Sequence, residues 1–356
     1  MNLNKVTLQN FRSYSKRIFS FTRNTTIIVG PNAQGKTNLL EALSLLSTGE
    51  SFRAQKIEEM LKIGEEVGRV KIEISHDNEK HLDQEDNEEL EVVITNGTVL
   101  GERAQKRKFL VNNTAKRKSD VVGRFPTVLF RPEDMDMVTG SPSLRRQFLN
   151  SVLVQADHEY RNSLDQYEKA LKRRNALLDL LREGSTTRAA FTFWDMLMIR
   201  HGEMLTKKRE EFIEYLNTHI DFPMKFQINY DPSRISEERL HKYAIQEVEV
   251  GYTLVGPHKD DFQITLHNGE EKDLAKYGSR GEQRMAILWL KLNELQFLET
   301  SLAEKPLLLL DDVFSELDEK HRKMILDTFS NQQTILTSTK LTVPDTITET
   351  AEVISL

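Results

Sequence analysis

Apolar and polar positions follow two different periods along the chain, and each period predicts one kind of element. At residues 70–74 apolar and polar side chains alternate, which is typical of a strand with one buried face. Residues 26–29 (TIIV) and 307–310 (LLLL) are uninterrupted runs, as in strands buried on both faces. From residue 142 to 221 apolar side chains recur every three or four positions within a highly charged stretch, which predicts helices. The pattern therefore predicts an α/β protein with an inserted, mainly helical lobe.

A glycine-rich segment follows the run at residues 26–29 and reads GPNAQGKT, which matches the phosphate-loop pattern G-x-x-x-x-G-K-[ST] without a mismatch. Gly30 and Gly35 let the backbone turn so that successive N–H groups face phosphate oxygens, and an apolar helical pattern follows. Lys36 would place its ammonium against the β- and γ-phosphates, and Thr37 would be a ligand of Mg²⁺. A glycine turn with a chance lysine is the alternative, which the strand before and the helix after disfavour. The candidate ATP-binding residues are Gly30, Pro31, Asn32, Ala33, Gln34, Gly35, Lys36, Thr37 and Asn38.

Two later segments carry residues that are also expected to contact the phosphates and Mg²⁺. The leucine run is followed by Asp311 and Asp312, as expected of a buried parallel strand that ends at the phosphate edge of its sheet. Asp311 is the expected partner of the Mg²⁺ on Thr37. Asp312 stands where a base must orient the attacking water, so Asp312 and Lys36 are the candidate catalytic residues. Upstream, a serine and a glycine at a helix start predict a second phosphate site, formed by Ser279, Arg280, Gly281, Glu282 and Gln283.

Composition and charge limit the partners. The formal net charge is −6, so contact with DNA requires local basic patches. The chain has no cysteine, which excludes disulfides and thiolate zinc sites. It has no apolar run of membrane-spanning length and no signal-peptide core, which predicts a cytoplasmic protein without a membrane partner. Each basic cluster alone is more typical of a solvated face. The candidate DNA-contacting residues are Lys106, Arg107, Lys108, Lys116, Arg117, Lys118, Lys172, Arg173 and Arg174.

A polar cluster after the turn Gly256-Pro257 leaves two interpretations open. His258, Asp260 and Asp261 are residue types that bind metal ions or serve nucleases. No second cluster of His, Asp or Glu accompanies them, and a Gly-Pro turn by itself accounts for local polarity. We therefore favour a structural role.

The order of these segments resembles a known family. The phosphate loop, the helical lobe, SRGEQ, LLLLDD and then Ser315, Glu316, Leu317 and Asp318 are similar to the ABC-type ATPase head of transporters, SMC proteins and DNA-repair ATPases. Within that group, VTLQNFRSY, GPNAQGKTN, VLFRPEDMDMVTGSPSLRRQFLN, TLVGPHKDDF, GSRGEQR and LLLLDDVFSELD resemble the bacterial RecF family of DNA replication and repair proteins. The resemblance extends from Val6 to Asp318. It implies a P-loop fold with a mixed sheet, in which residues 1–140 and 223–356 form an ATPase lobe and residues 141–222 the helical lobe.

The resemblance also implies a mechanism. ATP and Mg²⁺ are the expected cofactors, Ser279–Gln283 is the expected signature motif, and Ser315–Asp318 is the expected D-loop. ATP is expected to drive a head-to-tail homodimer in which the signature motif of one protomer closes over the nucleotide of the other. The expected role is in recombinational repair at single-strand gaps and stalled forks, on double-stranded and gapped DNA. RecR, and RecO through it, are the expected partners, and RecA loading and SOS induction the expected outcomes.

Two departures from the ABC pattern predict slow hydrolysis. Asp312 stands where many ABC ATPases carry a glutamate, and Thr337, Ser338 and Thr339 follow the next strand without a switch histidine. Both changes weaken the alignment of the attacking water, so we expect a slow DNA-dependent ATPase whose hydrolysis resets the dimer. A transporter subunit would be expected to carry the histidine and a shorter lobe. A purely structural SMC-like tether would need long heptad repeats, which the helical insert is too short to supply.

Overall fold

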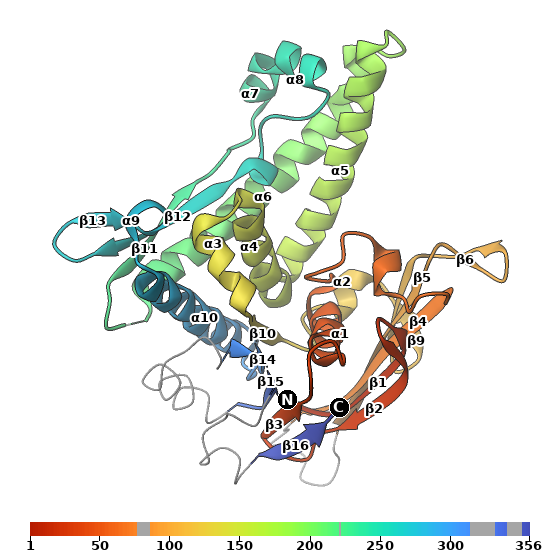
Figure 1. Ribbon diagram of the computed structural model, residues 1–356. Coiled ribbons are helices and arrows are strands. Elements are labelled where there is room, and N and C mark those ends of the chain that lie inside the picture. Colours follow the sequence, from red (N-terminus) through yellow and green to blue (C-terminus); the bar gives the residue numbers. More distant parts are fainter. Residues whose placement is uncertain (77–85, 221, 314–331, 340–350) are drawn as a thin grey trace. The chain divides into compact units, whose positions relative to one another are not determined.

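The computed structural model describes residues 1–76, 86–220, 222–313, 332–339 and 351–356, with the elements labelled in Figure 1. The chain divides into two compact units. The first comprises Met1–Pro132 and Leu298–Leu356, and the second comprises Glu133–Phe297.

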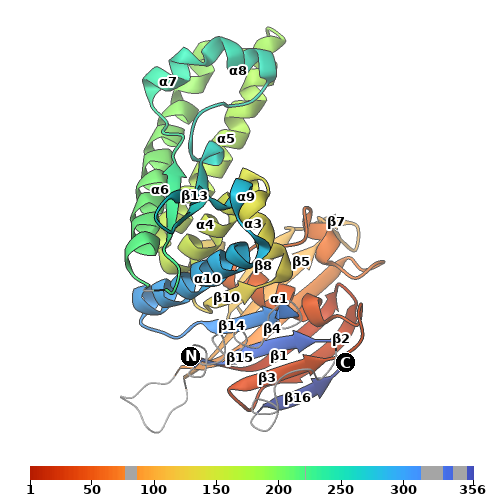
Figure 2. The same ribbon diagram turned by 60° about the vertical axis from the view of Figure 1, so that its left-hand side comes forward.

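The first unit contains a six-stranded antiparallel sheet in the order β2-β1-β4-β5-β8-β9 (Figure 2). Along β4 the side chains of Val70, Ile72 and Ile74 are buried, and the polar residues between them face the other side, as the alternation predicted. The strands are β1 (Asn2–Phe11), β2 (Tyr14–Ser20), β4 (Val67–His76), β5 (Asp86–Thr95), β8 (Arg107–Val111) and β9 (Thr114–Lys116). Short elements of the same unit are η1 (Ile57–Met60), β6 (Thr98–Val99), β7 (Glu102–Arg103) and α2 (Lys118–Val121).

A second sheet of the first unit is parallel throughout, in the order β10-β14-β15-β3-β16. Its strands are β3 (Thr25–Val29), β10 (Thr127–Phe130), β14 (Leu307–Asp311), β15 (Thr334–Ser338) and β16 (Glu352–Ser355). All five residues of β14 are buried, which confirms the strand predicted from the leucine run. Because the strands are parallel, the phosphate loop after β3 and the carboxylates at the end of β14 lie at the same edge of the sheet, with β15 between them.

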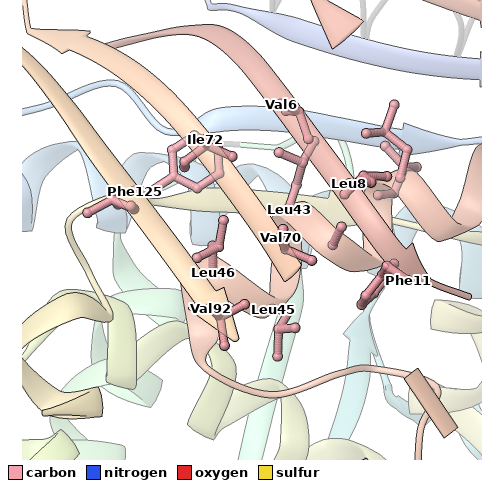
Figure 3. Packing of buried hydrophobic residues seen from close by; sticks show 14 of the residues in the cluster. Val6, Leu8, Phe11, Leu43, Leu45, Leu46, Val70, Ile72, Val92 and Phe125 are labelled. Carbon is pink, nitrogen blue, oxygen red and sulfur yellow. The ribbon is translucent and has the colours of Figure 1, made fainter. Parts of the chain in front are cut away.

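Helix α1 (Lys36–Thr48) packs against both sheets of the first unit. Leu43, Leu45 and Leu46 lie among side chains of the antiparallel sheet such as Val70 and Val92 (Figure 3). The same buried cluster includes residues of β3, β14 and β15. The helix that follows the phosphate loop is therefore a central part of the core, and its first turn is fixed by that packing.

The second unit is mainly helical. The predicted helical lobe is formed by the long helices α5 (His158–Arg182) and α6 (Thr192–Thr218), which pack against each other, together with α4 (Pro142–Ala156). Sequence explains the start of α5, because the Asp157 side chain accepts a hydrogen bond from the Tyr160 N–H at 2.9 Å as an N-cap. Smaller helices are η2 (Pro132–Met135), α3 (Asp136–Thr139), η3 (Arg188–Phe191), α7 (Glu237–Lys242), α8 (Ala244–Val250), η4 (Pro257–Lys259) and α9 (Leu274–Tyr277).

The second unit extends beyond the helical lobe proposed from the sequence. It also contains a three-stranded sheet in the order β11-β12-β13, made of β11 (Phe226–Asp231), β12 (Asp261–His267) and β13 (Glu271–Asp273). Strand β11 packs on α6 and β12 on α4, so these strands group with the helices and separately from the two larger sheets. Residues 133–140 and 223–297, which the sequence assigned to the ATPase lobe, belong to this unit. Helix α10 (Arg280–Leu302) begins in it and ends in the first unit.

Within the described residues, no helix combines the length and the apolar composition needed to span a bilayer.

Candidate nucleotide site

The phosphate loop connects β3 to α1 at the carboxyl edge of the parallel sheet. Gly35 has φ +107°, a left-handed conformation that favours glycine, and Ala33 at φ +68° shares that region. Helix α1 begins at Lys36, and its first hydrogen bond joins the Leu39 N–H to the Gly35 carbonyl at 3.1 Å. The free N–H groups of this helix start give the loop the character of an anion site.

The Lys36 ammonium lies inside the loop. Its Nζ donates to the carbonyl oxygens of Gly30 at 2.6 Å and Pro31 at 2.9 Å, and the residue is 7% exposed. These carbonyls hold the positive charge beside the helix start, where the pattern places the β- and γ-phosphates.

Three oxygen-bearing side chains meet where β14 and β15 end beside α1. The Thr37 Oγ1 lies 3.2 Å from Asp311 Oδ1, and Thr337 Oγ1 donates to the same carboxylate oxygen at 2.7 Å. Asp311 is 8% exposed. A hydroxyl and one carboxylate suit Mg²⁺, which commonly takes few protein ligands and completes its shell with phosphate oxygens and water. The described residues contain no group of three or more His, Cys, Asp or Glu side chains suited to a metal ion. A magnesium site here would therefore depend on the nucleotide for its other ligands.

Asp312 has an unusual backbone conformation. Its φ is +51°, and its N–H donates to the Thr337 carbonyl at 3.2 Å and to Thr337 Oγ1 at 3.1 Å. Left-handed non-glycine residues are uncommon and concentrate at functional sites. Thr337 thus holds the side chain of Asp311 and the backbone of Asp312. From the sequence, this segment was notable only because it lacks a switch histidine.

The turn between β1 and β2 supplies contacts that the sequence patterns missed. Arg12 makes a bidentate ion pair with Glu41 of α1, at 2.8 and 2.6 Å, and donates to the Glu59 carbonyl at 2.6 Å. Ser13 Oγ accepts from Asn38 Nδ2 at 2.9 Å. The signal that could have revealed this turn is Glu41 itself. It is fully buried within an apolar helix face, and a buried carboxylate requires a partner.

The predicted signature segment forms a capping box at the start of α10. Ser279 Oγ accepts from the Glu282 N–H at 3.3 Å, and Glu282 Oε2 accepts from the Ser279 N–H at 2.7 Å. Hydrogen bonds from Lys272, and then from Ser279, lower the pKa of Glu282 to about 2. A Cβ atom at Gly281 would meet nothing within 4 Å, so the backbone of the first turn is open on that side. Gln283 is turned away from this surface, because its side chain donates to the Leu274 carbonyl at 2.9 Å.

The cluster around His258 has internal partners throughout. Asp260 is fully buried and pairs with Arg209 at 2.7 Å, and Asp261 makes a bidentate pair with Arg145 at 2.6 and 3.0 Å. His258 Nδ1 accepts from the Tyr167 hydroxyl at 2.7 Å, and its Nε2 donates to the Thr253 carbonyl at 3.0 Å. These contacts join η4 and the start of β12 to α4, α5 and α6, which gives the cluster a structural role.

The basic clusters proposed for DNA differ in availability. Arg174 is 1% exposed and is paired with Asp195 at 2.6 Å and Glu247 at 2.7 Å, so its proposal as a DNA contact was wrong. A run of basic residues on a helix does not show which member faces inward. Some others carry surface ion pairs, namely Lys106 with Glu58, and Arg107 and Lys118 with Glu50. Exposed members of the clusters are Lys106, Lys108, Lys116, Arg117, Lys172 and Arg173. The predicted D-loop, Ser315–Asp318, lies outside the described residues.

The chain is similar to known proteins in both sequence and fold. Residues 2–355 match the family model described as the RecF/RecN/SMC N terminal domain. The chain is 34% identical over 353 residues to the DNA replication and repair protein RecF of Agathobacter rectalis, covering 96% of this chain and 93% of the relative. It is similar to a solved structure of the recombination mediator protein RecF-ATP in the RecFOR pathway, with a TM-score of 0.82, 33% identity and coverage of 96% and 93% of the two chains. An SMC head bound to the C-winged helix domain of ScpA shares the fold, with a TM-score of 0.52, 15% identity and coverage of 99% and 93%.

Proposed function

The chain belongs to the RecF/RecN/SMC N-terminal domain family and, within it, to the RecF DNA replication and repair proteins, and we propose that it is an ATP-switched DNA-binding protein of recombinational repair. The fold predicted from the sequence, that of the ABC and SMC ATPase heads, is thereby confirmed. The observation that carries the proposal is the contact of Thr37 and Thr337 with Asp311 beside the phosphate loop, in a chain this similar to a RecF-ATP structure.

ATP and Mg²⁺ are the proposed cofactors. Bound Mg²⁺ would neutralise charge on the phosphates and help to orient them. Lys36 and the N–H groups of the loop would bind the phosphates, and Thr37 with Asp311 would hold the ion. Thr337 would keep Asp311 oriented through its 2.7 Å hydrogen bond.

Hydrolysis is proposed to be slow. Asp312 is the candidate base for the attacking water, and its side chain is one methylene shorter than the glutamate of many ABC ATPases. Its backbone is held by Thr337, in a segment, Thr337 to Thr339, that lacks the switch histidine of those enzymes. With a shorter carboxylate and no imidazole beside it, alignment of the water is weaker, so turnover suits a switch that resets.

The switch is proposed to be a head-to-tail homodimer. In this arrangement Ser279 and Gly281 of one protomer would close over the γ-phosphate held by Lys36 of the other. The open side of Gly281 supports the proposal, because another chain can approach the α10 start there without displacing a side chain. Charge-assisted hydrogen bonds to the γ-phosphate would join the protomers, and hydrolysis would remove them.

DNA is the proposed macromolecular ligand, both double-stranded and gapped. Lys106, Lys108, Lys116, Arg117, Lys172 and Arg173 are exposed and remain candidate contacts, together with the partly exposed Arg107 and Lys118. Binding is expected to require ATP and to fall steeply with salt, since phosphate contacts release counterions. Family membership further supports a cytoplasmic role with RecR, and RecO through it, in RecA loading at gaps and stalled forks and in SOS induction.

Two experiments test this function. Sedimentation velocity with ATP, Mg²⁺ and gapped duplex should show a dimer for the parent chain and a monomer for Lys36→Ala. A parent chain that stays monomeric when saturated with ATP and DNA would refute the switch. Mixing Lys36→Ala with Ser279→Ala chains should restore one competent composite site and part of the ATPase activity. Mixtures no more active than either variant alone would exclude the shared site.

A further inference from the structure

The turn between β1 and β2 contacts the phosphate loop and α1 at three successive residues. Arg12, at φ +50°, pairs with the buried Glu41, and Ser13 accepts from Asn38. Tyr14, the third residue, reaches the backbone of the loop itself. Apart from Asn38, these side chains lie outside the nucleotide-binding pattern, and only their contacts indicate a role.

The Tyr14 hydroxyl donates to the Gly35 carbonyl oxygen at 3.1 Å. The same oxygen accepts the Leu39 N–H, also at 3.1 Å, which is the first hydrogen bond of α1. Tyr14 is 9% exposed, and its ring packs edge-on against Phe19 with 5.9 Å between ring centroids. A Cβ atom at position 35 would lie 2.7 Å from the Tyr14 hydroxyl oxygen. Gly35 therefore serves two needs, the positive φ and the close approach of Tyr14.

Holding this carbonyl also fixes the next N–H. In a trans peptide the carbonyl and the N–H of the following residue lie in one plane and point in opposite directions. The two hydrogen bonds to the Gly35 oxygen thus direct the Lys36 N–H away from Tyr14. Backbone N–H groups at this point of a phosphate loop face phosphate oxygens. Because this peptide is already oriented before the ligand binds, the free-energy cost of ordering it on binding is smaller.

We propose that Tyr14 is a positioning residue for the nucleotide phosphates, because its hydroxyl holds the Gly35–Lys36 peptide with the N–H directed into the phosphate loop. The inference rests on the proposed function, since it assumes that the loop binds a nucleotide. The pKa of Tyr14 is consistent with a permanent donor. Burial raises it to about 12, and the charge of Arg17 opposes only part of that effect.

The test compares two substitutions that each remove one buried tyrosine hydroxyl. Tyr14→Phe removes the donor to Gly35, and Tyr167→Phe removes the donor to His258 in the other unit. Affinities for Mg-ADP and for pyrophosphate are measured by calorimetry, and stability by urea unfolding. Pyrophosphate isolates the phosphate contacts from those of the base and sugar. Amide hydrogen exchange at Lys36 in the pyrophosphate complex reports whether its N–H is held on the ligand.

For Tyr14→Phe we expect the affinity for both ligands to fall about three- to tenfold, as for loss of one hydrogen bond. Exchange at Lys36 in the pyrophosphate complex should become faster by a similar factor. Tyr167→Phe should lose stability but keep the parental affinities. Parental affinity and exchange in Tyr14→Phe, with only a loss of stability, would refute the positioning role and leave the proposed function intact. A parent chain that binds neither ligand would instead refute the proposed function and the inference with it.

Discussion

Protonation of His258 should destabilise the second unit. Burial is the main reason why the pKa of this imidazole lies at about 4 instead of 6.5, and the charge of Lys259 acts in the same direction. The hydrogen bond of its Nε2 to the Thr253 carbonyl opposes the shift. Its Nδ1 accepts the Tyr167 proton, so protonation of that nitrogen removes an acceptor inside the cluster. The folded state therefore holds His258 neutral.

The sign and size of the effect follow from linkage. Because the folded pKa is below the unfolded value, the unfolded state binds the proton first as the pH falls through 6.5. The contribution to stability is complete above that pH and is lost as the pH falls toward 4. A shift from 6.5 to about 4 corresponds to about 3 kcal/mol in full, of which about 2 kcal/mol is lost by about pH 5.

The assay can be confined to the relevant unit. The chain has two tryptophans, Trp194 and Trp289, and both lie in residues 133–297, so their fluorescence during urea unfolding reports on this unit. His258→Gln is the matched control, because its amide can accept from Tyr167 and donate to Thr253 without titrating. Between about pH 7.5 and about pH 5 the parent should lose about 2 kcal/mol more than the variant. Other titrating groups are common to both chains and cancel. Parallel pH profiles would show that folding leaves the pKa of His258 unchanged and would refute the reasoning.

Three further predictions concern single contacts. Arg174→Met should destabilise the second unit by about 3–5 kcal/mol, because Glu247 would be left buried without its partner. Arg173→Met, at the exposed neighbouring residue, should change the free energy of unfolding by under about 0.5 kcal/mol. Equal effects of the two substitutions in urea unfolding would contradict this. Thr337→Val should weaken Mg²⁺-dependent ATP binding about 10- to 100-fold, because Asp311 would lose the hydrogen bond that orients it. Titration with ATP in the presence and absence of Mg²⁺ measures the effect, and an unchanged Mg²⁺ dependence would show that Thr337 does not orient the carboxylate. The capping box of α10 should be intact above the unfolded pKa of 4.5 and lost as the pH falls toward 2. The protection of the first-turn amides against hydrogen exchange, relative to the intrinsic rate at each pH, should therefore fall with acid in the parent but far less in Glu282→Gln, and equal losses of protection would contradict this.

The main elements of the fold were predictable because their patterns are local. The runs TIIV and LLLL are buried parallel strands, and the alternation at residues 70–74 is a half-buried antiparallel strand, as their periods indicate. The extent of the second unit was not predictable in the same way. Strands β11 and β12 have ordinary strand patterns, and only their packing on α6 and α4 decides which unit they join. Packing partners distant in the sequence leave no periodic signal.

The same distinction separates the site residues that were predicted from those that were missed. The phosphate loop and Asp311 follow local rules, a glycine-rich segment after a strand and a carboxylate at a strand end, and the structure brings Thr37 and Asp311 together. Thr337 and Tyr14 act through contacts to residues far along the chain, and nothing in their immediate sequence marks them. Gly35 is an intermediate case, because the motif requires the glycine, while the contact with Tyr14 gives a second reason for it.

Arginines that pair with fully buried carboxylates follow a rule of their own, and that rule explains the wrong proposal. Arg12, Arg174 and Arg209 each pair with a fully buried carboxylate, namely Glu41, Glu247 and Asp260. A buried ion pair adds little net stability over apolar packing, but loss of one partner leaves an uncompensated charge. Each pair therefore raises the free energy of any fold in which the segments that carry its two residues do not meet. The acidic partners are the better signal in a sequence, since an isolated carboxylate on an apolar face such as Glu41 must find a cation. A basic run such as residues 172–174 is more typical of a solvated face and does not show which member is buried. A search for DNA contacts in this family should thus begin by removing the basic residues that such carboxylates require.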